Sequence, residues 1–352
     1  MSELRDRLLK NSTIKDTDIL SKSKQFNKKD MIPTKVPAIN IALSGSLLGG
    51  LTPGVTIWAG PSKHFKTAFS LLMAKSYLDR YPEATLLFYD LEFGTPKDYF
   101  ASFGIDPERV IYTPLLDLES LKFDCVKQLT EVKRGDKVII LIDSIGNAAS
   151  KKELDDTLAE KSTQDMTRAK AIKSFFRMVT PHVATKDIPM VVICHTYMTQ
   201  EMYSKAVVSG GTGPYYSADS IFIIGRQQEK DKEGVIGYNF VINVEKSRMV
   251  REKSKIPITV LHNKGISKWS GLLDLAEEAG FIGKTKISRS LAWCLINRET
   301  GELLEDQKWT PEKTETNDFW KPILSDIDFI NFIEKKYKVA DGEIMNFDED
   351  SN

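Results

Sequence analysis

Eight consecutive residues, Gly60 to Thr67, have the composition and setting of a phosphate-binding loop. They read GPSKHFKT, follow a short β-branched run and precede a helical pattern. In such a loop, backbone N–H groups and the helix N-terminus bind anions, the lysine neutralises the β- and γ-phosphates, and the hydroxyl coordinates Mg²⁺. We therefore predict nucleoside triphosphate binding, with Lys66 on the phosphates and Thr67 on Mg²⁺. The predicted contact residues are Gly60, Pro61, Ser62, Lys63, His64, Phe65, Lys66 and Thr67.

Phe65 departs from the usual loop, in which a glycine precedes the lysine. A bulky residue rarely adopts a positive φ, so either this position is helical or the loop is strained. The alternative to phosphate binding is an ordinary strand-to-helix turn in which the lysine and the threonine are incidental. The strand pattern before the loop and the helix pattern after it favour the phosphate loop.

Three further polar residues, Glu92, Asp143 and His195, come at or just after the ends of apolar runs. Because carboxyl ends of parallel strands meet at one ligand-binding edge of a sheet, we expect them near Lys66. We predict that Asp143, followed by Ser144, holds Mg²⁺ through a water, and that Glu92 orients and activates the attacking water. Glu92 could equally be a solvated loop residue, and His195 an ordinary histidine at a strand end. The other histidines form no cluster with His195 at metal spacing, so we expect no zinc site.

Two polar stretches follow the Asp143 and His195 runs and leave the same predicted sheet edge. The first, residues 150–165, leads into a helix, and the second, residues 196–219, shows almost no periodicity. A loop as long as the second is usually functional or disordered, and the nucleotide state could order or release it. A solvated helix face is the default interpretation of the charges, but the basic residues could also meet a phosphate backbone. These basic residues are Lys151, Lys152, Arg168 and Lys205.

The residues that could do chemistry lie between about residues 50 and 265, where short β-branched or aromatic runs alternate with helical patterns. This alternation is typical of an α/β fold with a mostly parallel central sheet flanked by helices. Two further runs predict antiparallel strands at one edge of the sheet. The runs that predict the parallel strands are 55–59, 84–89, 110–113, 137–142, 189–194 and 221–224, and the antiparallel pair is 238–244 and 256–261.

Length and composition limit the class of protein. A chain of 352 residues is long enough for about two domains and an appendage. Lysine plus arginine and aspartate plus glutamate both number 49, so an anionic partner must be met by local patches. The 3 cysteines follow no paired spacing, and neither a membrane span nor a signal peptide is evident. We expect a soluble cytoplasmic protein with reduced thiols and no membrane partner.

Together these residues resemble the RecA-family recombinases, and most closely the phage branch of that family. Phe65 fits this resemblance, because the phage branch is similar to this chain in lacking the glycine before the lysine. The resemblance extends over nearly the whole chain. Its most specific segments are GPSKHFKT at 60–67, FYDLEFG at 88–94, FGIDPERVIYTP at 103–114, LIDSIGNAASKKE at 141–153, QDMTRAK at 164–170, SGGTGPYYSAD at 209–219 and VEKSR at 244–248.

The resemblance implies a RecA-like P-loop ATPase core at residues 33–268, an N-terminal oligomerisation extension at 1–32, and a small C-terminal α/β domain at 269–352 that ends in a short acidic tail. It implies ATP and Mg²⁺ as cofactors. It further implies a DNA-dependent ATPase that forms helical filaments on single-stranded DNA and exchanges strands with homologous duplex DNA. Recombination, repair and replication in the host cytoplasm are the implied setting. Mediator and single-stranded-DNA-binding proteins are implied partners.

The resemblance also implies roles for individual residues. Glu92 matches the catalytic glutamate, Tyr99 the aromatic residue that stacks on adenine, and His195 the polar residue that senses the γ-phosphate. Lys246 and Arg248 match basic residues that reach the nucleotide of the next protomer. The implied catalytic residues are Lys66, Glu92, His195, Lys246 and Arg248, and Tyr99, Asp143 and Ser144 join the loop in binding the nucleotide. The two polar stretches match the DNA-binding loops, with contacts expected from Lys151, Lys152, Arg168, Lys205, Gly210, Gly211 and Thr212.

Two other functions fit the same residues. One is a hexameric, helicase-like DNA motor, which shares the ATPase core but closes into rings. The other is a nucleotide-switched scaffold that binds proteins and does not handle DNA. Rings without filaments would identify the first, and ATPase activity indifferent to single-stranded DNA would identify the second.

Overall fold

The computed structural model describes residues 3–14, 17–23, 30–146, 148–159, 167–200, 204–230 and 234–340. The chain divides into two compact units, residues 1–30 and 31–352. In the described part of the first unit, helix α1 (Glu3–Asn11) has no buried residue, and its apolar side chains Leu4 and Leu8 are exposed. Among the described helices of both units, none has the length and apolar character of a membrane span.

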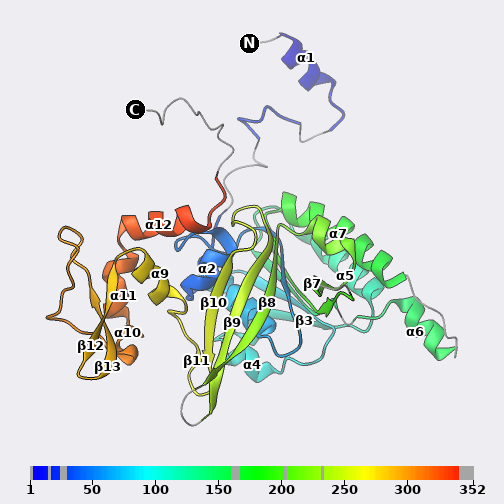
Figure 1. Ribbon diagram of the computed structural model, residues 1–352. Coiled ribbons are helices and arrows are strands. Elements are labelled where there is room, and N and C mark those ends of the chain that lie inside the picture. Colours follow the sequence, from blue (N-terminus) through cyan, green and yellow to red (C-terminus); the bar gives the residue numbers. More distant parts are fainter. Residues whose placement is uncertain are drawn as a thin grey trace. The chain divides into compact units, whose positions relative to one another are not determined.

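The second unit is built on a nine-stranded sheet with the strand order β11-β10-β9-β8-β1-β5-β4-β2-β3 (Figure 1). From β3 to β8 along this order the neighbouring strands pair in parallel, whereas β8, β9, β10 and β11 pair antiparallel. The predicted α/β fold with a mostly parallel sheet and an antiparallel edge is therefore confirmed. The strands are β1 (Gly54–Ala59), β2 (Thr85–Asp90), β3 (Val110–Pro114), β4 (Val138–Asp143), β5 (Pro189–Cys194), β8 (Ser220–Lys230), β9 (Val235–Ser247), β10 (Lys255–Leu261) and β11 (Gly265–Ile266).

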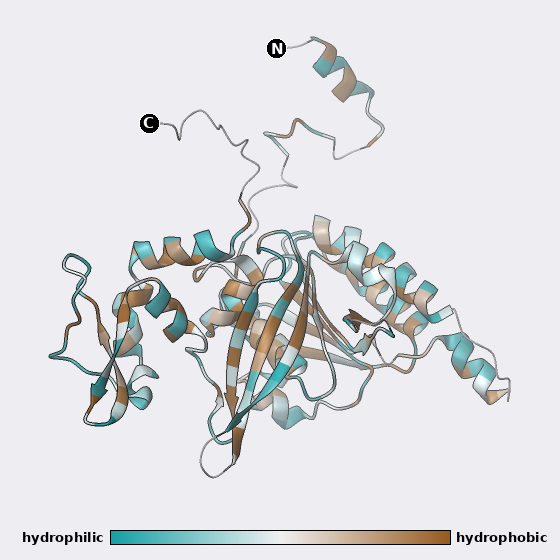
Figure 2. Cartoon of the chain, viewed as in Figure 1, coloured by the Kyte–Doolittle hydropathy of each residue, from teal (hydrophilic) through white to brown (hydrophobic). Residues whose placement is uncertain are grey.

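Helices cover both faces of the sheet because its central strands are apolar on both sides, as their colouring in Figure 2 shows. Strand β1 shows the alternation, since Trp58 packs in one hydrophobic core while Ile57 and Ala59 pack in the other. Helices α2 and α3 contribute to the first core, and α5 and α7 contribute to the second. The helices near the sheet are α2 (Pro37–Ser44), α3 (Lys66–Arg80), α4 (Lys97–Ser102), α5 (Leu118–Glu131) and α7 (Thr167–Thr185).

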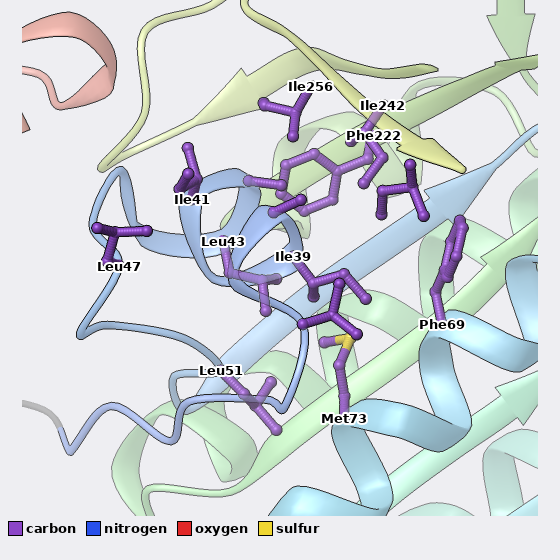
Figure 3. Packing of buried hydrophobic residues seen from close by; sticks show 14 of the residues in the cluster. Ile39, Ile41, Leu43, Leu47, Leu51, Phe69, Met73, Phe222, Ile242 and Ile256 are labelled. Atoms are coloured by element: carbon purple, nitrogen blue, oxygen red, sulfur yellow. The ribbon is translucent and has the colours of Figure 1, made fainter. Parts of the chain in front are cut away.

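Packing in the first core fixes the helix that follows the phosphate loop. Figure 3 shows side chains of α2, α3 and strands β8 to β10 meeting there, with Phe69 and Met73 contributed by α3. Both of these side chains are fully buried. Because α3 begins at Lys66, its burial against the sheet also sets where the loop lies.

The two polar stretches contain more regular structure than their sequence indicates. The first begins with α6 (Lys151–Leu158), whose N-cap Ser150 forms a capping box with Glu153. The expectation of a loop throughout 196–219 is wrong, because β6 (Thr196–Met198) pairs antiparallel with β7 (Ala206–Val208) and α8 (Thr212–Ser217) follows. Residues 160–165 and 201–203 of these stretches lie outside the described part of the chain.

Two glycines turn the chain into α8. Gly210 and Gly211 have φ values of +103° and +71°, in the region that favours glycine. A Cβ atom at Gly210 would lie 3.2 Å from Ile172 of α7, and one at Gly213 would lie 2.9 Å from the backbone of Lys173. The turn and the first residues of α8 are therefore packed closely against α7.

The region from Trp269 onwards combines a two-stranded sheet with short helices. Trp269 and Trp320 stack with ring centroids 5.8 Å apart. The Arg251 N–H donates to the Tyr337 carbonyl at 2.8 Å, which joins the end of the last helix to the turn after β9. The predicted acidic tail, residues 341–352, lies outside the described residues. The elements are α9 (Leu272–Glu278), β12 (Ile282–Ile287), β13 (Ser290–Leu295), α10 (Pro311–Thr314), α11 (Asn317–Leu324) and α12 (Ile327–Tyr337).

Candidate active site

A cavity of about 480 Å³ lies beyond the carboxyl ends of β1, β2, β4 and β5. Its wall includes residues 62–68, which join β1 to α3. The wall also includes Glu92 and His195, from beyond β2 and β5, Asp143 at the end of β4, and Tyr99 of α4. Burial raises the pKa of Tyr99. The structure therefore brings these sequence-predicted residues together, while their contact with a nucleotide stays a prediction.

The predicted phosphate-binding loop has an unusual backbone. Lys63 and Phe65 have φ values of +60° and +55°, although neither is a glycine. Phe65 directly precedes α3 and is left-handed, a conformation that costs a bulky residue free energy. Of the two alternatives that the missing glycine leaves open, a helical position or a strained loop, the structure has the strained loop.

Ring packing holds Phe65 in this conformation. Its ring centroid lies 5.0 Å from that of Phe240 on β9 and 6.4 Å from that of Phe69 on α3. Phe240 is fully buried and also faces the ring of His64 at 6.2 Å. Aromatic pairs contribute about 0.5–1.5 kcal/mol each beyond area burial, which is comparable to the cost of one left-handed residue.

Lys66 is almost fully buried at the start of α3. Its Nζ donates to the Pro61 carbonyl at 2.8 Å, so the side chain folds back over the loop. Burial lowers the pKa of Lys66, and the carboxylates of Glu92 and Asp143 act in the opposite direction. Because an ammonium has three donors, Lys66 can bind phosphate oxygens in addition to this carbonyl.

Thr67 and Asp143 are the residues predicted to hold Mg²⁺. The Thr67 hydroxyl donates to Oδ2 of Asp143 at 2.7 Å. Oδ1 of Asp143 is buried and has no hydrogen-bond partner among the described residues. Burial raises the pKa of Asp143 to about 6, and the hydrogen bond from Thr67 opposes the rise.

These groups fit Mg²⁺ because the hydroxyl and the carboxylate are hard oxygen ligands, and a cation would give the buried Oδ1 a partner. Within the described ranges, no group of three or more His, Cys, Asp or Glu side chains is placed to hold a metal ion. Mg²⁺ beside Asp143 would therefore take its other ligands from water and phosphate, as it commonly does at nucleotide sites.

Glu92 is the centre of a hydrogen-bonded group of side chains. Its Oε1 accepts from Oγ of Ser144 and from Nε2 of His195, both at 2.5 Å. The hydrogen bond from His195 lowers the pKa of Glu92 most; burial opposes this effect and Ser144 adds to it. The arrangement keeps the Glu92 carboxylate ionised at neutral pH, which is the state required of a general base.

Asp90 fixes the turn that carries Glu92, and sequence analysis does not identify it. Its Oδ1 accepts from the N–H groups of Glu92 at 3.0 Å and Phe93 at 2.7 Å. Its Oδ2 accepts from the Tyr112 hydroxyl at 3.1 Å. Asp90 is buried and lies opposite Asp143 in the register of β2 and β4. Its place at the end of an apolar run is the signal that could have identified it.

Lys246 lies near the end of β9 and Arg248 directly after it, and both are outside the cavity. Nζ of Lys246 donates to the carbonyls of Tyr215 at 2.5 Å and Ala218 at 2.7 Å, at the C-terminal end of α8. Burial is the main cause that lowers the pKa of Lys246. Arg248 is 77% exposed and pairs with Asp219 at 3.1 Å. Neither side chain lines the cavity of its own chain, so a role at a neighbouring protomer stays a prediction.

The basic residues predicted to bind DNA differ in exposure. Lys151 and Lys152 begin α6 and are exposed, as is Lys205 just before β7. Arg168, at the start of α7, is half-buried, and its Nε donates to the Ala148 carbonyl at 2.9 Å. Its Nη2 is buried and finds no partner in the part of the chain that the structure describes. Arg168 therefore braces the turn after β4, while the three lysines face solvent.

Gly146, in the turn after β4, packs closely against His195 and the second polar stretch. A Cβ atom there would lie 2.8 Å from the backbone nitrogen of His195 and 2.9 Å from the hydroxyl oxygen of Ser209. Only glycine therefore allows this close approach. The Ser209 N–H also donates to the His195 carbonyl at 2.8 Å. His195 thus contacts Glu92 through its ring, and through its backbone it contacts the turn after β4 and the second polar stretch.

Two more residues of the cavity wall, Arg226 on β8 and Tyr238 on β9, are also missed by sequence analysis. Cζ of Arg226 lies 4.7 Å from the centre of the Tyr238 ring. No motif marks either residue. The strand order is the signal that could have revealed them, because β8 lies beside β1 and continues past the loop that follows β1.

Comparison with known proteins identifies a relative over nearly the whole chain. The chain is 52% identical over 341 residues to the recombination and repair protein of Enterobacteria phage T4, which covers 97% of this chain and 87% of that protein. Residues 269–333 match the family described as "Bacteriophage T4, Recombination and repair protein, C-terminal domain".

More distant similarity extends to RecA proteins. The chain is 26% identical over 268 residues to Protein RecA of Solidesulfovibrio magneticus, covering 73% of each chain. It is 25% identical over 260 residues to Protein RecA of Nitratidesulfovibrio vulgaris, covering 72% of this chain and 70% of that protein. The resemblance inferred from the motifs is therefore confirmed by both sets of relatives.

Proposed function

The chain belongs to the family of the phage T4 recombination and repair protein, UvsX, within the RecA family, and on this premise we propose that it is an ATP-dependent DNA recombinase. It forms helical filaments on single-stranded DNA and catalyses homologous pairing and strand exchange in phage recombination, repair and recombination-dependent replication. The observation that carries this proposal is the single cavity that holds Lys66, Glu92, Asp143 and His195 at the carboxyl edge of the sheet.

ATP hydrolysis is the reaction that these side chains support. Bound ATP supplies the γ-phosphoryl group, and Mg²⁺ held beside Thr67 and Asp143 would neutralise charge that develops on it. Glu92, held by Ser144, orients and activates a water for attack. Lys66 stabilises negative charge on the phosphates, and Tyr99 provides a ring for the adenine. The carboxylate is fixed before the substrate arrives, which reduces the reorganisation that the reaction requires.

His195 couples the nucleotide to DNA in this proposal. Its ring is hydrogen-bonded to Glu92, and its backbone contacts Gly146 in the turn that leads to the first polar stretch and Ser209 in the second. A γ-phosphate near Glu92 changes the charge that His195 faces. This change favours the arrangement of the two polar stretches that binds DNA. Hydrolysis removes that bias and lowers the affinity for DNA.

The proposed filament gives each part of the chain a role. Residues 1–32 dock on a neighbouring protomer, 33–268 form the RecA-like ATPase core, and 269–352 form the small C-terminal domain. The exposed Leu4 and Leu8 of α1 support the docking role. Contacts repeated head to tail with a rotation that does not close produce an open helix.

Lys246 and Arg248 act on the nucleotide of the neighbouring protomer in this filament. The exposure of Arg248 supports this role. Within its own chain Arg248 pairs with Asp219 at an exposed site, where such pairs contribute about 0–1 kcal/mol. Arg248→Ala should therefore fold normally and lose DNA-stimulated ATP hydrolysis. Normal stimulated hydrolysis by this variant would show that the interface does not use Arg248.

Single-stranded DNA binds through backbone charge with little dependence on sequence. Exposed Lys151, Lys152 and Lys205 support phosphate contacts from each protomer. The equal numbers of basic and acidic residues fit this picture, because cooperative assembly multiplies weak individual contacts. Mediator and single-stranded-DNA-binding proteins are the expected partners in the host cell.

Strand exchange between homologous DNAs is the experiment that tests the proposal. The full chain with ATP should transfer a strand from the duplex to the homologous single strand, and it should fail without ATP. Electron microscopy with a non-hydrolysable ATP analogue should show filaments on the DNA. Uniform hexameric rings without strand exchange would instead support the helicase-like motor, and ATPase activity that ignores DNA would support the scaffold.

A further inference from the structure

Arg226 is a basic residue of the nucleotide cavity to which the proposed mechanism gives no task. It comes from β8, which pairs in parallel with β1 so that Ile223 lies opposite Ala59. The phosphate loop starts directly after Ala59, and a residue just beyond Ile223 therefore lies beside the loop. Accordingly, Nη1 of Arg226 lies 3.4 Å from the Lys63 carbonyl, at the long end of the hydrogen-bond range.

Tyr238 holds the Arg226 side chain in place. It lies on β9 opposite Gln228, so Arg226 and Tyr238 are diagonal neighbours on one face of the β8–β9 pair. Cζ of Arg226 sits 4.7 Å from the ring centre, within the range of cation–π contacts. The Tyr238 ring lies 6.0 Å from that of Phe240, which in turn packs on Phe65 of the loop. The same row of rings thus supports the loop and the arginine beside it.

The positive charge of Arg226 is not neutralised by the described part of the chain. No Asp or Glu among the described residues forms an ion pair with it. One long bond to a carbonyl leaves most of the five guanidinium N–H donors for other acceptors. After burial and the Ser62 carbonyl, Arg226 and Lys66 are the next groups that influence the pKa of His64, and both lower it. Positive charge from Arg226 therefore reaches the tip of the phosphate loop.

We propose that Arg226 binds the phosphate chain of the nucleotide in its own protomer, and that Tyr238 is the positioning residue that holds it there. This inference rests on the proposed ATP site and adds to it a cation supplied by the same chain, separate from Lys246 and Arg248. A planar guanidinium binds phosphate oxygens through two donors at once, which a lysine does not. Because the contact is to phosphate, it strengthens binding of ATP, ADP and inorganic pyrophosphate and leaves adenosine unaffected.

Calorimetric titration of the full chain without DNA tests the proposal. Arg226→Gln should raise the Kd for ADP about tenfold, the lower end for a hydrogen bond between charged groups. Arg226→Lys keeps the positive charge but loses the paired donors of the guanidinium, and it should raise the Kd for ADP about threefold. Tyr238→Leu should raise it about two- to fivefold through loss of the ring, while Tyr238→Phe keeps the ring and should match the wild type. Lys230→Gln, which removes an exposed charge from β8 outside the cavity, is the matched control.

The outcomes separate this inference from the proposed function. Lys66→Ala provides the reference for an ATP site, because it removes the predicted phosphate-binding lysine. If Lys66→Ala binds ADP at least tenfold more weakly and Arg226→Gln binds it like the wild type, the role of Arg226 is overturned and the ATP site stands. An equal loss of adenosine affinity in Arg226→Gln would also overturn the phosphate contact. Failure of the wild type to bind ADP at all would refute the proposed function itself. Should Arg226→Gln fold poorly, Arg226→Lys takes its place. A raised Kd of this variant for pyrophosphate would support the phosphate contact, and a wild-type Kd would overturn it.

Discussion

The two walls of the proposed nucleotide cavity are held together by different forces. On the wall formed after β2, β4 and β5, polar side chains fix one another, as where Glu92 accepts hydrogen bonds from Ser144 and His195. On the wall formed by β8 and β9, rings pack, as where Phe240 lies against Phe65 of the phosphate loop. The first wall carries groups that could do chemistry, and the second carries groups that support a strained backbone.

This difference separates the chemistry of the site from the positioning of its loop. The base proposed at Glu92 needs directional partners that set its ionisation and its angle, which hydrogen bonds provide. A loop that presents backbone N–H groups to phosphates needs stiffness, which close packing provides. Changes in the polar wall should therefore alter turnover before stability, and changes in the aromatic wall should alter stability and nucleotide affinity before chemistry.

Glu92→Gln should produce the largest effect on the polar wall. The amide keeps the shape and a hydrogen-bonding oxygen but cannot act as a base, so the rate of DNA-stimulated ATP hydrolysis should fall by about 10²–10⁴-fold. The Kd for ATP should stay within about threefold of the wild type, since the amide still fits beside Ser144 and His195. Steady-state hydrolysis and ATP titration measure the two quantities. Glu131→Gln, at an exposed position of α5, is the control, and an unchanged rate in Glu92→Gln would place the base elsewhere.

Phe240→Ala should produce the largest effect on the aromatic wall. Phe240 lies on β9, is fully buried and packs against Phe69 of α3. Truncation of such a ring lowers the free energy of unfolding by about 3–5 kcal/mol. The affinity for ADP should fall as well, because Phe65 loses the ring that holds it. Urea unfolding and ADP titration check these effects. Phe240→Leu should have a free energy of unfolding and an ADP affinity between those of Phe240→Ala and the wild type. Normal ADP affinity in a folded Phe240→Ala protein would contradict a positioning role.

The polar wall could be predicted from the sequence, whereas the aromatic wall could not. Glu92, Asp143 and His195 each follow an apolar run, and parallel topology brings the ends of such runs together. Phe240 and Tyr238 belong to a run whose alternation predicts only an antiparallel strand. Which loop their rings touch depends on the strand order, because β8 places β9 beside the phosphate loop only by pairing with β1.

The stretch after His195 shows a second limit of sequence analysis. Strands β6 and β7 span three residues each, which is too short for periodicity to be recognised. Their position depends on contacts between distant segments, such as that of Gly146 with Ser209. In contrast, α6 could be recognised from Ser150 and Glu153, because a capping box is encoded within four consecutive residues.

Asp143 belongs to the polar wall, yet its charge should reduce stability without nucleotide and Mg²⁺. Its pKa rises from 3.8 to about 6 on folding, so the folded state binds the proton more tightly than the unfolded state. Stability therefore falls as pH rises from about 4 to about 6, and a cost of about 3 kcal/mol remains above that range. Asp143→Asn should be more stable than the wild type at pH 8 by about 1–3 kcal/mol, with the advantage vanishing near pH 4.

Urea unfolding of both proteins between pH 4 and pH 8 measures this difference. Glu131→Gln removes the same charge from an exposed position and should show no comparable dependence on pH. A difference between Asp143→Asn and the wild type that stays constant across this range would show that the carboxylate is not destabilised by its burial.

Phe65 should show the smallest net effect, because strain and packing oppose each other at this position. Phe65→Gly removes the strain of the left-handed conformation, about 1–2 kcal/mol. It also loses the ring contacts with Phe240 and Phe69, and the greater freedom of glycine in the unfolded chain lowers stability further. Its free energy of unfolding should therefore fall by less than that of Phe240→Ala, because the relief of strain offsets part of the loss of the ring. Phe65→Ala keeps the strain and loses the ring, so it should be less stable than Phe65→Gly by about 1 kcal/mol. Urea unfolding compares the stability of the two variants. Equal stability would mean that the left-handed conformation at Phe65 costs no free energy.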